Sequence, residues 1–430
     1  MEMRWLCIYL VILLIPIPLV NSSYQVEESS MMFNGHHIMA SDQMIRFTDE
    51  EIDDLFLDML LELGVDSVSL YISNVTYKMY MDRYERLIEK IRENEKKLVL
   101  LPYILPGKNQ PLDDYFNKRL NVTLHHVKKY KPDYVIILNE PSIIGDIEMP
   151  PMVLKNYAEN ISREIKKLGI PTRIIVTVHS YELFLIPYFI EVEDIDIIGI
   201  NMYSDKNLEN IRKAISYIKS NGKEAWIWET WWRTQKIGGG GKLPFKIMLP
   251  RFRSYNHQNE VCEWIKFIYD FNKENNLKVL NPFFTEQFIY CNSPPYLPLW
   301  KQFKELIKAI KEGDRTMSYR FYKDLIDGDK HGNTYIHILE PINCLYLHGW
   351  ETIPIRSNAY ILGGEVKVKT IVFNEDKVEF YIDDKLEYTD TIEPYEWIWN
   401  NPEKGYHEIK VVTYNNQGDK IEDKTSIIVL

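Results

Sequence analysis

Residues 134–141 read Tyr134-Val135-Ile136-Ile137-Leu138-Asn139-Glu140-Pro141, an apolar run that stops at a carboxylate. Short, β-branched apolar runs of this kind are typical of strands in a parallel sheet. Pro141 lacks the backbone N–H that a further ladder bond needs, so the strand must end at once. The pattern predicts that Leu138 is packed and that Glu140 emerges at the carboxyl end of a buried strand.

Seven more runs alternate with amphipathic stretches of ten to twenty residues. The predicted strands are His37–Ala40, Ser67–Ile72, Leu98–Tyr103, Tyr134–Leu138, Ile174–Val178, Ile195–Ile200, Ala225–Trp228 and Leu280–Phe284. The predicted helices are Glu50–Leu63, Tyr80–Asn94, Leu112–Tyr130, Met152–Leu168, Leu208–Ser220, Val261–Asn275 and Trp300–Lys311. Eight strands that alternate with helices over residues 34–313 predict a (β/α)₈ TIM barrel, whose active site lies at the carboxyl ends of its strands.

The pattern changes after Gly313. Residues 314–333 are charged and rich in turn formers, and we expect them to form a linker. Residues 334–430 hold only short alternating runs, which predict a small all-β immunoglobulin-like sandwich. The runs are Tyr335–Leu339, Val366–Phe373, Val378–Ile382, Glu408–Tyr414 and Ser426–Leu430. The segments 378–384, 391–399, 405–411 and 414–419 resemble the immunoglobulin-like accessory domains of secreted microbial proteins.

Composition and the N-terminus limit the classes of function. The formal net charge of −11 makes a general nucleic-acid binder implausible, because phosphate backbones are repelled. The chain has no CxxC pair, and we expect neither a metal nor a cofactor. Residues 1–22 read as a signal peptide with the apolar run Trp5–Val20, so the body should be secreted or at the cell surface. An uncleaved anchor is the alternative, and the oligomeric state stays open.

A second carboxylate is expected at the same rim as Glu140. The predicted seventh strand, Ala225–Trp228, ends in Glu229. Strands four and seven lie nearly opposite each other in a small barrel, so their terminal side chains can meet across its mouth. Two carboxyl groups about 5–5.5 Å apart are the requirement for glycoside hydrolysis with retention. Glu286, at the end of strand eight, is a rival to Glu229.

These features resemble the retaining (β/α)₈ glycoside hydrolases of clan A, over about residues 35–312. The resemblance implies that Glu140 is the acid/base, that Asn139 contacts a sugar 2-hydroxyl and that Glu229 is the nucleophile. It also implies that Tyr203 donates a hydrogen bond to the nucleophile. We therefore expect a raised pKa for the acid and an ionised Glu229. Two features depart from the pattern: the arginine usual near the end of strand two is missing from residues 71–74, and aromatic residues replace the tryptophan usual after strand eight.

The remaining rim residues are candidates for binding a poly- or oligosaccharide. They are Asn139, His179, Asn201, Tyr203, Trp228, Trp231, Trp232 and Glu286. The three indoles around Glu229 can stack on pyranose rings or serve as core. His179 can bind sugar, donate to a carboxylate or only fill the rim. Two functions follow: a secreted glycoside hydrolase, or a non-catalytic cell-surface carbohydrate-binding protein that retains a glycosidase barrel.

Overall fold

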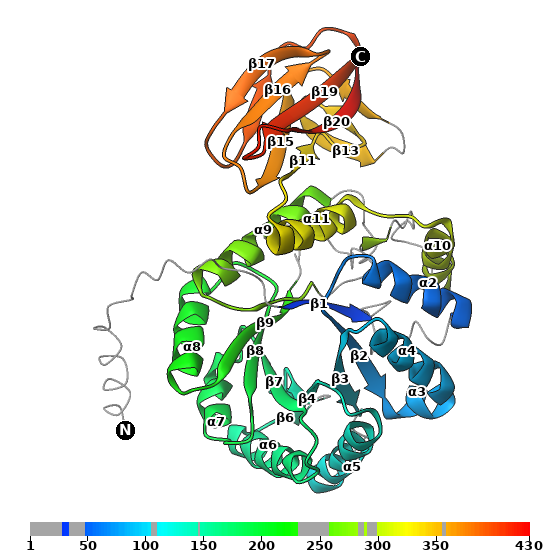
Figure 1. The fold of residues 1–430 in the computed structure, drawn as a ribbon, viewed down its shortest axis with the longest axis vertical. Coiled ribbons are helices and arrows are strands. Elements are labelled where there is room, and N and C mark those ends of the chain that lie inside the picture. Colours follow the sequence, from blue (N-terminus) through cyan, green and yellow to red (C-terminus); the bar gives the residue numbers. More distant parts are fainter. Residues whose placement is uncertain are drawn as a thin grey trace, which may run out of the picture.

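The computed structural model describes residues 28–33, 48–104, 110–144, 147–230, 258–282, 288–289, 299–354 and 358–430. Its larger body is built on one parallel sheet in the order β10-β1-β2-β3-β4-β7-β8-β9. Figure 1 shows these strands curling around a common centre with helices outside them. The strands are β1 (Glu28–Phe33), β2 (Ser67–Ser73), β3 (Lys97–Tyr103), β4 (Tyr134–Asn139), β7 (Arg173–His179), β8 (Ile197–Met202), β9 (Glu224–Thr230) and β10 (Val279–Leu280).

Helices follow most of these strands. Seven of them lie where the apolar periodicity predicts, whereas the short elements at residues 74–79, 183–185 and 186–190 were not predicted. The helices are α2 (Glu50–Leu61), α3 (Asn74–Met79), α4 (Met81–Glu93), α5 (Leu112–Tyr130), α6 (Pro151–Lys166), η1 (Leu183–Leu185), α7 (Ile186–Ile190), α8 (Leu208–Ser220), α9 (Gln258–Glu274) and α10 (Leu299–Glu312). A short hairpin of β5 (Ile143–Ile144) and β6 (Ile147–Glu148) follows β4. In the described residues, no helix is long and apolar enough to span a bilayer.

The two ends of the sheet approach each other. β1 pairs in parallel with both β2 and β10, and an isolated parallel bridge joins Thr230, at the end of β9, to Pro282. The expected first strand, His37–Ala40, lies outside the described residues, and β1 lies upstream of it. The sheet therefore begins before residue 34, the expected start of this body.

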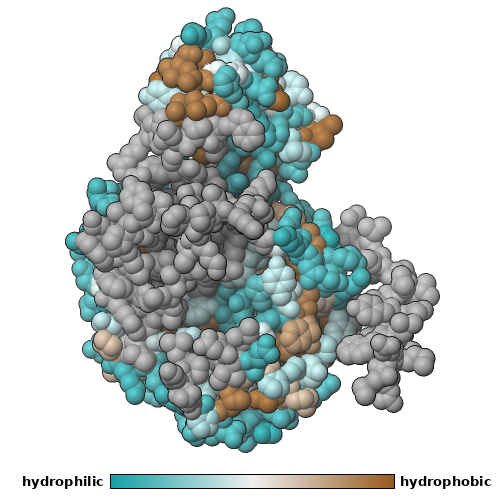
Figure 2. Space-filling view, turned by 180° about the vertical axis from the view of Figure 1, so that it is seen from behind, coloured by the Kyte–Doolittle hydropathy of each residue, from teal (hydrophilic) through white to brown (hydrophobic). Residues whose placement is uncertain are grey.

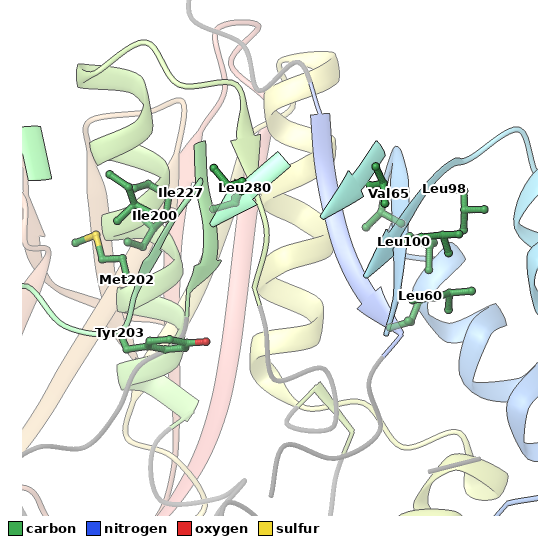
Figure 3. Packing of buried hydrophobic residues seen from close by; sticks show 14 of the residues in the cluster. Leu60, Val65, Leu98, Leu100, Ile200, Met202, Tyr203, Ile227 and Leu280 are labelled. Carbon is green, nitrogen blue, oxygen red and sulfur yellow. The ribbon is translucent and has the colours of Figure 1, made fainter. Parts of the chain in front are cut away.

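The strands alternate between two apolar layers, as the period of two in a strand requires. Residues such as Leu98, Leu100 and Ile200 pack against the helices. Their neighbours Val99, Ile136 and Trp226 join a separate cluster that contains no helix residue, so this cluster fills the inside of the curled sheet. Figure 3 shows part of the outer layer, with Tyr203 beyond Met202 and its phenol directed inward.

The segment 314–333 forms a helix where we expected a turn-rich linker. Helix α11 (Met317–His331) buries Phe321, Tyr322, Leu325 and Ile326 in the core of the larger body. These residues recur at helical spacing. Six charged residues on the other face give the segment the composition of a linker, and this conceals the spacing. Thr316 caps the helix by accepting a hydrogen bond from the backbone N–H of Tyr319 at 3.3 Å.

The C-terminal region is a sandwich of two sheets around one apolar core. One sheet has the order β11-β15-β18, and the other has the order β13-β12-β14-β20-β19-β16-β17. The first is built from β11 (Tyr335–Glu340), β15 (Val366–Phe373) and β18 (Glu396–Trp399). The second is built from β12 (Cys344–Leu347), β13 (Trp350–Pro354), β14 (Ala359–Leu362), β16 (Val378–Ile382), β17 (Lys385–Asp390), β19 (Gly405–Tyr414) and β20 (Lys420–Val429).

The sandwich packs directly on the larger body (Figure 1). Leu339, Ile371 and Phe373 of the smaller sheet belong to the apolar cluster of the larger body. The ring of Phe373 lies 5.2 Å from that of Phe321 on α11, and Lys369 pairs with Glu263 on α9. Apolar packing thus joins the two parts without a flexible segment between α11 and β11. From the opposite side, exposed hydrophobic residues form separate groups on a mostly hydrophilic surface (Figure 2).

Candidate active site

Asn139 and Glu140 leave β4 at a bulge and a sharp turn. The β4–β7 register shifts between Ile136 and Leu138, which places Asn139 opposite Thr177. Glu140 has a φ of 43°, a left-handed conformation that non-glycine residues seldom adopt. Its backbone N–H donates to the carbonyl of Thr177 at 3.0 Å, which fixes the turn. Backbone strain of this kind is often found where a side chain must be aimed.

Glu229 is a buried carboxylate surrounded by donors. It lies near the end of β9 with 3% of its surface exposed. The Tyr71 hydroxyl donates to its Oε1 at 2.5 Å, and the Asn139 amide donates to the same oxygen at 3.2 Å. The Tyr203 hydroxyl donates to Oε2. Three donors from β2, β4 and the end of β8 therefore hold one carboxylate in place.

Asn201, on β8, connects the two carboxylates. Its amide nitrogen donates to Glu140 Oε1 at 3.0 Å and to Asn139 Oδ1 at 3.1 Å. Its amide oxygen accepts the backbone N–H of Glu229 at 3.2 Å. Thr177 also donates to Asn139 Oδ1, so the orientation of the Asn139 amide is fixed from two sides. Glu140, Asn139, Asn201 and Glu229 thus form one hydrogen-bonded unit.

The electrostatics of Glu229 differ from the sequence-based expectation. Burial, together with the negative charge of Glu140, raises the pKa of Glu229 to about 7, although Tyr203, Tyr71 and Asn139 act in the opposite direction. Burial and the nearby carboxylates raise the pKa of both phenols well above the usual range, so Tyr71 and Tyr203 stay protonated donors. A fully ionised nucleophile at acidic pH is therefore not what this pocket favours.

Three residues of the site were not identified from the sequence. Tyr71 lies in the segment 71–74, from which the expected arginine is missing, and its hydroxyl reaches the carboxylate. Thr177 orients Asn139. Glu182 accepts the backbone N–H of His179 at 2.7 Å and that of Ser142 at 2.8 Å, so it ties the end of β7 to the turn that carries Glu140. Tyr71 could have been identified as a site residue, because it lies close to the carboxyl end of a predicted strand.

Trp228 does not belong to the substrate-binding set. It is fully buried inside the curled sheet, where its ring stacks on Trp226 at 5.7 Å between centroids. Residues two apart on β9 face the same side, so Trp226 and Trp228 are both directed inward. Trp231, Trp232 and Glu286 lie outside the described residues.

His179 is half-buried at the rim and lies between two phenols. Its ring stacks on Tyr203, with centroids 5.9 Å apart, and on Tyr181, with centroids 4.8 Å apart. Among the residues that the structure describes, no group of three His, Cys, Asp or Glu side chains could hold a metal ion.

Solved structures with a similar fold include an FMN-binding β-glucuronidase from Facaelibacterium prausnitzii L2-6, with a TM-score of 0.59 and 13% identity. A β-glucuronidase from Bacteroides uniformis has a TM-score of 0.58 and 12% identity. A β-glycosidase from Bacteroides vulgatus has a TM-score of 0.50 and 13% identity. The structural neighbours of this chain are glycoside hydrolases. The similarity covers 95%, 95% and 94% of this chain but only 57%, 46% and 50% of those proteins, about half of their length.

Residues 336–411 match the family model of a bacterial Ig domain. The match covers strands from β11 to β19 and agrees with the sandwich seen in the structure. No curated protein matches the sequence significantly. At these identities the structural similarity establishes the fold, and the activity must be inferred from the site itself.

Proposed function

We propose that the chain is a secreted glycoside hydrolase that cleaves a poly- or oligosaccharide by a retaining double displacement. The observation that carries the proposal is the buried Glu229, which accepts hydrogen bonds on both of its oxygens. The Asn201 side chain connects the two carboxylate residues, because it donates to Glu140 and accepts the backbone N–H of Glu229. A carboxylate held this rigidly suits attack on an anomeric carbon. The glycosidase fold of the neighbours supports the same reaction class.

In the first step, Glu229 attacks the anomeric carbon and the bond to the leaving oxygen breaks. Glu140 gives its proton to that oxygen, which leaves a sugar ester on Glu229 and an ionised Glu140. In the second step, Glu140 takes a proton from water, the water oxygen attacks the anomeric carbon, and the ester bond breaks. Both carboxyl groups then return to their starting states, and the sugar keeps its anomeric configuration.

The donor pattern distinguishes the two carboxylates. Glu229 accepts three side-chain hydrogen bonds, and a proton on either of its oxygens would displace a donor. Glu140 accepts the Asn201 amide on one oxygen. We therefore assign the acid role to Glu140 and the role of nucleophile to Glu229.

We propose in addition that the sheet closes as a complete (β/α)₈ barrel, which the bridge from Thr230 to Pro282 supports. Residues 1–22 are proposed as a cleaved signal peptide on the pattern of the sequence alone. N-terminal sequencing of exported protein should then begin near Ser23, and a cytoplasmic pool that begins with Met1 would contradict export.

The experiment compares Glu140→Gln with the unmodified enzyme on two kinds of substrate. Hydrolysis of natural oligosaccharides should fall by several orders of magnitude, whereas the first step on dinitrophenyl glycosides should be spared, because a good leaving group needs little protonation. Glu209→Gln, on the exposed surface of α8, is the matched control and should change neither. Equal loss on both substrates would argue against Glu140 as the acid. An unmodified protein that binds oligosaccharides and cleaves none would favour the non-catalytic alternative.

A further inference from the structure

We propose that Tyr181 is a stacking platform for a second sugar unit of the substrate, at a distance from the sugar held at the two carboxylates. The proposal rests on the proposed function, and it deepens that function by assigning an oligosaccharide rather than a single-sugar glycoside as the substrate. It starts from the row of rings that leads from Glu229 to the surface. Tyr203 contacts Glu229, His179 stacks on Tyr203, and Tyr181 stacks on His179.

Exposure increases along this row. Tyr203 is buried, His179 is half-buried, and Tyr181 has 62% of its surface exposed. The planes of His179 and Tyr181 differ by only 18°, so one face of the phenol is covered by the imidazole. A large aromatic side chain that stays this exposed beside a catalytic pocket is available to a ligand. The exposed ring surface of Tyr181 is therefore available to a ligand at the rim of the site.

The platform is held rigidly. Glu182 is buried and accepts the backbone N–H groups of His179 and Ser142 at 2.7 and 2.8 Å. Its own N–H donates to the His179 carbonyl at 2.7 Å, which closes the turn around Tyr181. Because Ser142 lies two residues after Glu140, the same carboxylate fixes the platform relative to the acid. A preorganised site of this kind loses little conformational entropy when a ligand binds.

The structure also supplies a polar contact beside the platform. The backbone N–H of Tyr181 donates to Nδ1 of His179 at 3.2 Å, so the neutral imidazole carries its proton on Nε2. No hydrogen bond in the described residues uses that Nε2–H. The aromatic face of Tyr181 is suited to the apolar C–H face of a pyranose, and the Nε2–H of His179 is a donor for a hydroxyl group of the same saccharide.

The position of Tyr181 determines which sugar it can touch. His179 covers one face of Tyr181, so a sugar ring stacked on the other face is separated from Tyr203 and Glu229 by both the phenol and the imidazole. The sugar under attack must contact Glu229 itself. The unit on Tyr181 is consequently a different and more distant unit of the same saccharide, and short aryl glycosides do not reach the platform.

The test compares Tyr181→Ala with Tyr181→Phe, which keeps the ring and removes only the hydroxyl. Cello-, xylo-, manno- and laminarihexaose serve as long probes, and 4-nitrophenyl glycosides of the same sugars serve as short probes. On the hexasaccharide that is cleaved best, Tyr181→Ala should lower kcat/KM roughly tenfold, and Tyr181→Phe should lower it less than twofold. Neither variant should change kcat/KM for the nitrophenyl glycoside by more than about twofold.

The control is Tyr217→Ala, an exposed tyrosine on α8, which should leave both activities unchanged. Equal losses of kcat/KM on long and short probes, or no loss of kcat/KM with Tyr181→Ala, would overturn the platform. Neither result would contradict the proposed hydrolase activity. Calorimetric titration of Glu140→Gln with the same hexasaccharides adds a readout that needs no turnover. If binding depends on Tyr181 and the unmodified protein cleaves nothing, the platform stands and the proposed hydrolysis fails. If no hexasaccharide is either bound or cleaved, both proposals fail.

Discussion

At the scale of single residues, two phenols support Glu229, and within the described part of the chain no arginine donates to it. A neutral donor stabilises a carboxylate less than a guanidinium does, because it adds no opposite charge. The burial of Glu229 is therefore only partly offset, and its pKa lies near 7. Tyr71 and Tyr203 should set the pH at which the enzyme becomes active.

Tyr71→Phe removes one of the donors to Glu229 Oε1 and keeps the ring. Loss of a hydrogen bond to the ionised form raises the pKa further, so the acidic limb of the kcat/KM profile should move up by about one pH unit. Tyr217→Phe, on α8, should leave the profile unchanged. An acidic limb that stays in place in Tyr71→Phe would show that Tyr71 does not support the charge.

Glu229 should also make stability depend on pH. Its pKa is raised in the folded state, so folding favours the protonated form, and stability falls as the pH rises from about 4.5 toward about 7. Glu229→Gln removes this penalty and should raise the free energy of unfolding by up to roughly 3 kcal/mol at pH 8, with little gain at pH 4. Urea unfolding at both pH values measures the difference. An equal gain in the free energy of unfolding at both pH values would contradict the raised pKa of Glu229.

At the scale of elements, Gly199 on β8 allows its neighbours to approach. A Cβ at this position would lie 3.0 Å from Thr177 Cγ2 and 3.0 Å from Trp228 Cβ. Gly199→Ala should therefore cost about 1–3 kcal/mol of stability and lower activity, because Thr177 orients Asn139. Adding Thr177→Ser, which removes the colliding methyl and keeps the hydroxyl, should restore part of both losses. Thermal melting and kcat/KM report the two effects, and an unchanged melting temperature in Gly199→Ala would refute the contact.

The elements also show what the sequence could and could not predict. Strand runs such as Tyr134–Leu138 and helices such as α5 were predictable because apolar periodicity reflects local burial. Helix α11 was missed because its charges lie on one face and mask the spacing of its apolar residues. Trp228 is predicted at the rim, but it lies two residues after Trp226 and shares the inward side of β9 with it. Tyr71 was missed because its partner is 158 residues away along the chain.

At the scale of the whole molecule, the sandwich and the larger body share an apolar interface around Phe373. We expect the two parts to unfold together. Phe373→Ala should remove about 3 kcal/mol of stability and lower a single calorimetric transition. Leu386→Ala, an exposed residue of β17, is the control and should have little effect. Two transitions in the unmodified protein, with only one of them shifted by Phe373→Ala, would show that the parts are independent.

The central claim is that Glu229 becomes covalently attached to the sugar. The most direct measurement incubates the enzyme with a 2,4-dinitrophenyl 2-deoxy-2-fluoroglycoside of the sugar that it cleaves best, followed by peptide mass spectrometry. The fluorine slows the second step, so the ester should accumulate. We expect a mass increase of one fluorosugar on the peptide that contains Glu229 and none in Glu229→Gln. The same label on the peptide that contains Glu286, or turnover with no labelled peptide, would contradict the assignment.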